Sequence, residues 1–118
     1  MANAAIVIGW GPAVRGREHK ALQVFNEAIQ WYTQQQQQGA IESFEPVALE
    51  PHGGELNGFL IIRGDRDKLN QLRASDEFTR LNNRAGMVVD NLGVIGAYIG
   101  EGLQRLFADF DQQASELG

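Results

Sequence analysis

The chain of 118 residues contains no cysteine. This absence excludes disulfide bonds, thiolate metal sites and cysteine nucleophiles. Only two histidines are present, which is fewer than the ligands that a zinc site needs, so we expect no bound metal. Serine is also scarce: Ser43, Ser75 and Ser115 are the only ones, and they form no specific Ser–His–Asp set.

The sequence also has few basic residues and no long apolar runs. Ten basic side chains face fifteen acidic ones, which leaves a net charge of −5. No basic surface is therefore expected for nucleic acid or an anionic membrane. No apolar run approaches the about 20 residues of a membrane span, and residues 1–10 lack the basic start of a signal peptide. We expect a cytoplasmic protein that binds neither nucleic acid nor membrane.

What the chain does contain is enough apolar material for a core. Hydrophobic residues make up 43% of the sequence, close to the globular norm. A chain of this length fits one domain. We therefore expect a single domain over residues 1–118, with a core unit over 4–98 and a C-terminal helix over 101–117.

Hydrophobic periodicity divides this chain into strands and helices. Short β-branched runs predict strands over residues 4–10, 41–49, 56–64 and 87–98, the last of them bulged at its glycines. Apolar residues at helical spacing, among them Leu22, Phe25, Ile29 and Tyr32, predict a helix over 17–38. Asp65 and Ser75 are expected N-caps of a two-part helix that ends near Gly86.

The order of these elements predicts an α+β, ferredoxin-like βαββαβ fold with a four-stranded antiparallel sheet and an added C-terminal helix. The strands are apolar on both faces, because Ile6 and Ile8 oppose Val7, and Leu60 opposes Ile61. Helices cover one face of such a sheet. The other face would remain an apolar patch in water, which soluble monomers rarely expose. We therefore expect a homodimer that pairs through the open sheet face.

The whole pattern resembles the dimeric α/β-barrel superfamily, in which two ferredoxin-like subunits close their sheets into one barrel. Three segments, 50–54 (EPHGG), 76–78 (DEF) and 90–94 (DNLGV), resemble small bacterial members with no assigned activity. The superfamily includes cofactor-free monooxygenases, haem-degrading enzymes, isomerases and ligand-sensing domains. The resemblance therefore implies the fold and the dimer, and it leaves the function open.

Trp10 and Arg63 are candidate site residues, because they end the first and third strands, which neighbour each other in this topology. An indole and a guanidinium there could line a pocket for an anionic or aromatic ligand. The alternative is that Trp10 belongs to the core or to the dimer interface, and that Arg63 pairs with Asp65 or Glu45.

His52 is the third candidate, as a general base in the turn between the second and third strands. The alternative is a solvent-exposed turn histidine. Neither His52 nor His19 matches the iron-binding histidine of the haem-degrading members. The dinucleotide pattern G-x-G-x-x-G also fails, because Val14 takes the place of the third glycine. No cofactor is therefore expected.

Two functions remain open. The first is a homodimer that binds a small organic ligand in a cavity of each subunit, with cofactor-independent oxidation or isomerisation as the chemistry and His52, Trp10 and Arg63 as site candidates. The second is a non-enzymatic interaction or regulatory module, in which the dimer or its C-terminal helix is the functional surface.

Overall fold

The computed structural model describes residues 1–118 and contains four strands and four helices. The strands are β1 (Ala4–Trp10), β2 (Ser43–Ala48), β3 (Gly58–Gly64) and β4 (Gly93–Tyr98). The helices are α1 (Glu18–Gln37), α2 (Arg66–Arg73), α3 (Asp76–Gly86) and α4 (Gly100–Leu117).

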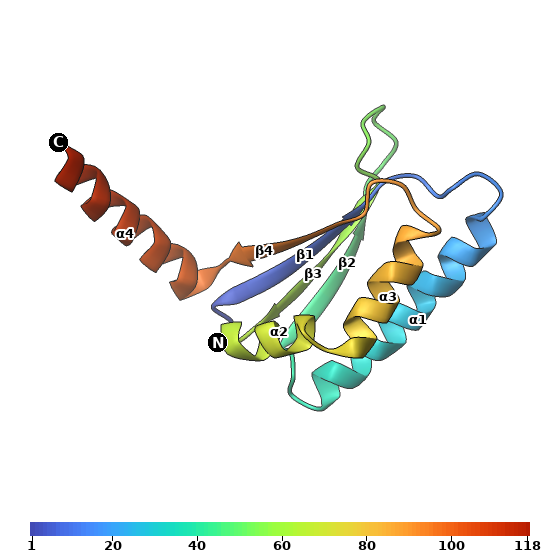
Figure 1. The fold of residues 1–118 in the computed structure, drawn as a ribbon, viewed down its shortest axis with the longest axis horizontal. Coiled ribbons are helices and arrows are strands. Elements are labelled where there is room, and N and C mark those ends of the chain that lie inside the picture. The colour runs from blue at the N-terminus through green and yellow to red at the C-terminus, as the bar shows by residue number, and fades with distance from the viewer.

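The strands form one antiparallel sheet in the order β2-β3-β1-β4. Together with the element order, this is the expected ferredoxin-like topology. Helices α1 and α3 lie side by side on one face of the sheet (Figure 1). The core lies between these layers. Ile6 and Ile62 are partners in the register and are the most deeply buried strand residues.

The two-part helix follows the expected caps. The carboxylate of Asp65 accepts a hydrogen bond from the backbone N–H of Lys68 at the start of α2. The hydroxyl of Ser75 accepts one from Phe78 at the start of α3. Each cap satisfies a backbone donor that has no partner inside its helix. The predicted break between the two parts is confirmed.

The fourth strand is shorter than expected. Residues 87–92 do not join it, and β4 begins only at Gly93. The preceding loop instead pairs with the loop after β1, through hydrogen bonds from Val14 N to Val88 O and from Asp90 N to Pro12 O. Asn91 then takes a left-handed backbone conformation, with φ of 57°. The β-branched pattern of the valines at 88 and 89 predicts a strand, but it does not reveal which backbone they will pair with.

The two faces of the sheet differ in what covers them. Ile6, Ile8 and Leu60 point toward the helices and are buried. Side chains alternate between the faces, so Val7, Phe59, Ile61, Val47 and Ile95 lie on the opposite face. No helix of the chain covers that face (Figure 1). Ile95 is 59% exposed there.

Helix α4 projects away from the rest of the chain, beyond the end of β4 (Figure 1). None of its residues is buried. No helix in the structure is long and apolar enough to cross a membrane. The expected C-terminal helix is confirmed, and it contributes nothing to the core of its own subunit.

Candidate functional site

A cavity of about 470 Å³ lies between α1, α3 and the sheet. Twenty residues line it, and sixteen of them are hydrophobic. The sheet contributes Ile8, Trp10 and Leu60, and α1 contributes Leu22, Phe25, Ile29 and Tyr32. The other wall comes from α3 and the loop after it, with Leu81, Ala85, Val88 and Leu92. Volume and lining are both typical of a small-molecule site.

The cavity opens where α1 begins. Leu22 lines it and is nevertheless 62% exposed. The apolar spacing placed Leu22 on the same buried stripe as Tyr32, but only Tyr32 and Val24 are buried in α1. Because α3 ends at Gly86, it does not extend over the first turns of α1, and this leaves Leu22 at the rim.

Few polar residues line this apolar space: Glu18, Asn57, Asn82 and Tyr32, of which Tyr32 is only 1% exposed. Burial raises the pKa of Tyr32 well above its ordinary value of 10.0, and the neighbouring Asn82 side chain offsets part of that rise. A phenol with the ordinary pKa of 10.0 is already protonated at neutral pH, and the rise leaves that state unchanged. The phenol can donate a hydrogen bond to a ligand, and it cannot act there as a base.

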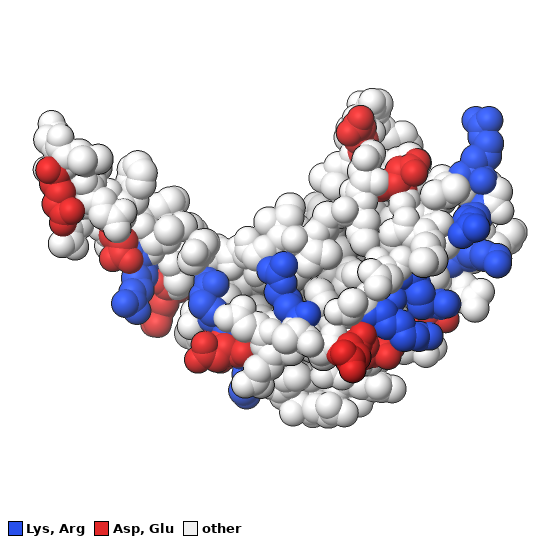
Figure 2. Space-filling model, in the orientation of Figure 1, with Lys and Arg blue, Asp and Glu red and all other residues white.

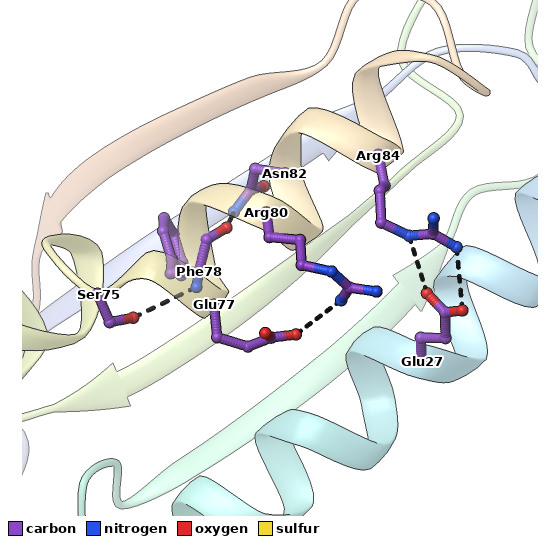
Figure 3. Close-up of polar contacts among 7 residues, drawn as sticks. All are labelled: Glu27, Ser75, Glu77, Phe78, Arg80, Asn82 and Arg84. Carbon is purple, nitrogen blue, oxygen red and sulfur yellow. Dashed lines mark hydrogen bonds and ion pairs between the residues drawn. The ribbon is translucent and has the colours of Figure 1, made fainter.

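An ion pair joins the two helices that wall the cavity (Figure 3). Arg84 of α3 donates from Nε to Oε2 of Glu27 at 3.1 Å, and from Nη2 to Oε1 at 3.0 Å. This paired geometry is the most specific that arginine and a carboxylate can form. It bridges α3 and α1, the two helices that wall the cavity.

Trp10 is the one candidate of the three that lines the cavity. Its ring meets that of Phe25 edge-on, with centroids 5.9 Å apart. Such edge-to-face pairs are favourable because of the charge distribution of aromatic rings. Trp10 also packs against the core. The residue therefore belongs both to the cavity lining and to the edge of the core.

Arg63 lies away from Trp10. Their strands are antiparallel neighbours, and the register pairs Trp10 with Gly58 and Arg63 with Ala5. The two side chains are therefore at opposite ends of the strands and on opposite faces of the sheet. Arg63 Nη2 lies 3.2 Å from Oε1 of Glu45, which is one of the two pairings considered from the sequence.

His52 lies in the exposed loop between β2 and β3 and does not line the cavity. Its Nδ1 accepts a hydrogen bond from Gly54 N at 3.1 Å, and its Nε2 lies 2.7 Å from the carbonyl oxygen of Leu56. The ring thus ties together the two sides of its own loop. No group of three His, Asp or Glu side chains in the structure could hold a metal ion.

Several solved structures share this architecture. One is a dimeric ferredoxin-like protein of unknown function from Bacteroides fragilis, 12% identical, covering 81% of this chain and 96% of that one, with a TM-score of 0.59. Another is an EthD family protein from Bacillus halodurans, 9% identical, covering 83% and 99%, with a TM-score of 0.65. A candidate antibiotic biosynthesis monooxygenase from Bacteroides thetaiotaomicron is 15% identical, covers 82% and 90%, and has a TM-score of 0.55.

These comparisons establish the fold. The chain is similar to known ferredoxin-like proteins over most of its length and over nearly all of theirs. No protein-family model and no curated protein sequence matches it. Identities of 9 to 15% support no transfer of activity from these proteins, so the site has to be interpreted from its own geometry.

Sequence reasoning identified Trp10 and missed Tyr32 and Asn82. Tyr32 belongs to the predicted apolar stripe of α1, and nothing in the sequence singles out Asn82. A tyrosine within an apolar helical stripe indicates a polar contact in the interior, since a buried tyrosine usually finds a hydrogen-bond partner. The partner could not be found from the sequence, because 50 residues separate Tyr32 from Asn82.

Proposed function

We propose that this protein binds a small, largely apolar organic molecule in the cavity between α1, α3 and the sheet. The observation that supports this most directly is the cavity of about 470 Å³ with its hydrophobic lining. Ligand pockets typically measure about 300 to 1,000 Å³ and combine apolar walls with a few polar groups. An aromatic ligand of one or two rings fits both requirements.

The polar groups suggest how such a ligand would be oriented. The Tyr32 phenol, which is protonated at neutral pH, can donate to a carbonyl or hydroxyl oxygen. Glu18 and Asn57 lie on the same lining and can accept from or donate to the ligand. If the protein is an enzyme, cofactor-independent oxidation or isomerisation is the reaction class that we propose. Of the three candidates from the sequence, Trp10 is the one in position to contact a substrate.

We further propose that the protein works as a homodimer through the open face of the sheet. Val7, Phe59, Ile61 and Ile95 form an apolar surface that nothing in the chain covers. Burying such a surface against a second copy removes it from water. Light scattering tests this directly and should give about twice 13.0 kDa. A particle of 13.0 kDa at all concentrations would refute the dimer.

Ligand binding can be tested with naphthalene and 1-naphthol as probes. We expect both to quench the fluorescence of Trp10, measured in the Trp31→Phe variant because the chain has two tryptophans. Both should also raise the thermal midpoint of unfolding, because they bind the native state only. Ala28 lines the cavity, so Ala28→Phe should fill part of it and weaken binding at least about tenfold. Ala108→Phe adds the same ring to exposed α4 and should leave binding unchanged.

The variant needs its own check, because a phenylalanine at position 28 could disturb folding. Ala85→Leu fills the opposite wall with a smaller side chain, and it should weaken binding in the same direction. Equal affinity of the wild type, Ala28→Phe and Ala85→Leu for the probes would contradict binding in the cavity.

One observation favours the alternative function, a non-enzymatic interaction or regulatory module. Helix α4 presents an apolar stripe that its own subunit leaves uncovered, as helices used for association do. The two functions predict different roles for the cavity, because only the first requires it to bind a small molecule. A protein whose dimer is unaffected by Ala28→Phe, and which binds no small-molecule probe, would be an interaction module.

A further inference from the structure

We propose that α4 is a dimerisation arm, whose apolar stripe packs on a second copy of this chain. The proposal rests on the homodimer proposed above and adds α4 to its interface. Leu103, Leu106, Phe107 and Phe110 follow helical spacing along one side of α4. Phe107 is 63% exposed and Phe110 is 70% exposed. Aromatic side chains that are this exposed in a single chain are typical of protein–protein interfaces.

The direction of α4 is determined by its joint with the N-terminus of the chain. Gly100 has φ of +55°, and a Cβ there would lie 2.9 Å from the carbonyl oxygen of Ala2. A Cβ at Gly102 would collide with the carbonyl oxygen of Asn3. Only glycine allows the backbone to approach this closely. The close backbone contacts of Gly100 and Gly102 therefore fix the direction of α4. Nothing in the chain supports the later turns of the helix.

A helix of this kind is weak on its own. Ile99 occupies the N-cap position and makes no side-chain capping hydrogen bond. Two glycines in the first turn each cost about 1 kcal/mol relative to alanine. Isolated helices of this length are marginal in water, and tertiary packing supplies most helical stability in proteins. An occupant for the apolar stripe would therefore stabilise α4.

The surface around α4 shows where a second copy fits. Both α4 and the loop between β2 and β3 rise on the side of the sheet that faces away from α1 and α3 (Figure 1). Figure 2 shows the molecule hollowed between them. The charged side chains of α4 lie on its outer side, and its side toward the hollow is uncoloured (Figure 2). The stripe and the open sheet face thus belong to one continuous surface.

The size of this surface favours a second copy that covers both parts. A helix of 18 residues presents a face of roughly 270 Å² in projection, about 27 by 10 Å. Four strands of six to seven residues present roughly 380 Å². A standard interface buries about 800 Å² on each partner. In projection each surface alone is less than half of that figure, and the two together give roughly 650 Å².

Charge argues against a membrane as the occupant. Glu101, Asp109, Asp111 and Glu116 outnumber Arg105 on α4. Helices that lie on membranes carry Lys and Arg on their polar face, because cellular membranes are anionic. An acidic arm is suited to a protein surface.

Phe107→Glu together with Phe110→Glu tests the arm. Both positions are exposed in the single chain, so each subunit should fold normally, as circular dichroism can verify. We expect the dimer dissociation constant, from light scattering and sedimentation, to rise at least about 100-fold. The matched control is Gln112→Glu, which adds charge to the polar side of the same helix and should change the constant less than about twofold.

Hydrogen exchange provides the second measurement. The α4 amides should be protected in the wild-type dimer and should lose that protection in the double variant. A wild-type dimer whose dissociation constant and α4 exchange are unaffected by the double variant would overturn the arm and leave the homodimer intact. A wild-type monomer would overturn both. Protection of α4 in that monomer only by phosphatidylcholine vesicles would identify a membrane as the occupant.

Discussion

Gly58 lies directly beneath the indole ring of Trp10. The two residues are partners in the register of β1 and β3. A Cβ on Gly58 would lie 2.7 Å from Cζ2 of Trp10 and 2.7 Å from the carbonyl oxygen of Val47. The ring that lines the cavity therefore rests on a position where any side chain would displace it.

Replacing this glycine should destabilise the fold and move the ring. For Gly58→Ala we expect a loss of about 1 to 3 kcal/mol in the free energy of unfolding, as for overpacked cores. Urea titration measures the loss, and tryptophan emission reports the displacement. Gly93→Ala is the matched control, since a Cβ there meets nothing within 4 Å. It should change stability by less than about 0.5 kcal/mol. Equal stability of the two variants would contradict the close packing of Trp10.

The ion pair between the cavity walls should be sensitive to a change from arginine to lysine. Arg84→Lys keeps the charge and loses the paired hydrogen bonds to Glu27. Both side chains are about one-third exposed, at 37% and 33%, so solvent weakens the interaction, and we expect a loss of about 0.5 to 1 kcal/mol. The measurement is urea unfolding at low and high salt.

A second pair on the same helix provides the control for that variant. Arg80 and Glu77 are three residues apart on α3 and more exposed (Figure 3). Because this pair joins no second element, Arg80→Lys should cost only about 0.3 kcal/mol. If Arg84→Lys proved as mild as Arg80→Lys, the pair with Glu27 would not be holding the two helices together.

Tyr32 predicts a loss of stability at alkaline pH. Burial raises the pKa of its phenol above the ordinary value of 10.0, so the folded state retains a proton that the unfolded state releases. Its contribution is fully present below pH 10.0 and is lost as the pH rises from there toward the folded pKa. The difference in unfolding free energy between wild type and Tyr32→Phe, followed from pH 8 to about pH 11, isolates this contribution.

Two observations test whether the titration of Tyr32 causes this loss of stability. Below pH 10.0 the difference between the wild type and Tyr32→Phe should not change with pH. Above it the difference should shrink with each increase in pH. A difference that stayed constant to the alkaline end would mean that the phenol titrates equally in both states.

The open sheet face provides a fourth prediction. Ile95 is 59% exposed in the single chain, so Ile95→Glu should not impair folding. In a dimer that covers this face the same change would bury a charge in an apolar contact, which is costly. Light scattering should show the mass falling toward 13.0 kDa. Gln36→Glu, on the exposed end of α1, should leave the mass unchanged. A stable dimer of Ile95→Glu would place the interface elsewhere.

Much of the fold was predictable from local pattern. The strand Ala4–Trp10 and the caps Asp65 and Ser75 were all expected and are present. These features depend on neighbouring residues, and so the sequence shows them directly. The error at residues 87–92 has the opposite origin. Those residues pair with the loop after β1, more than 70 positions away, and local propensity does not report such pairing.

By itself, the sequence determined the chemistry that this protein lacks and the order of its elements. No arrangement in space can supply a thiolate to a chain without cysteine, and periodicity along the chain follows from backbone geometry alone. Only the tertiary structure decided the site. It brought Tyr32 beside Asn82 around an apolar cavity, and it separated Trp10 from Arg63 on opposite faces of the sheet. Such distances depend on how strands register and helices pack, and they have no counterpart in sequence spacing.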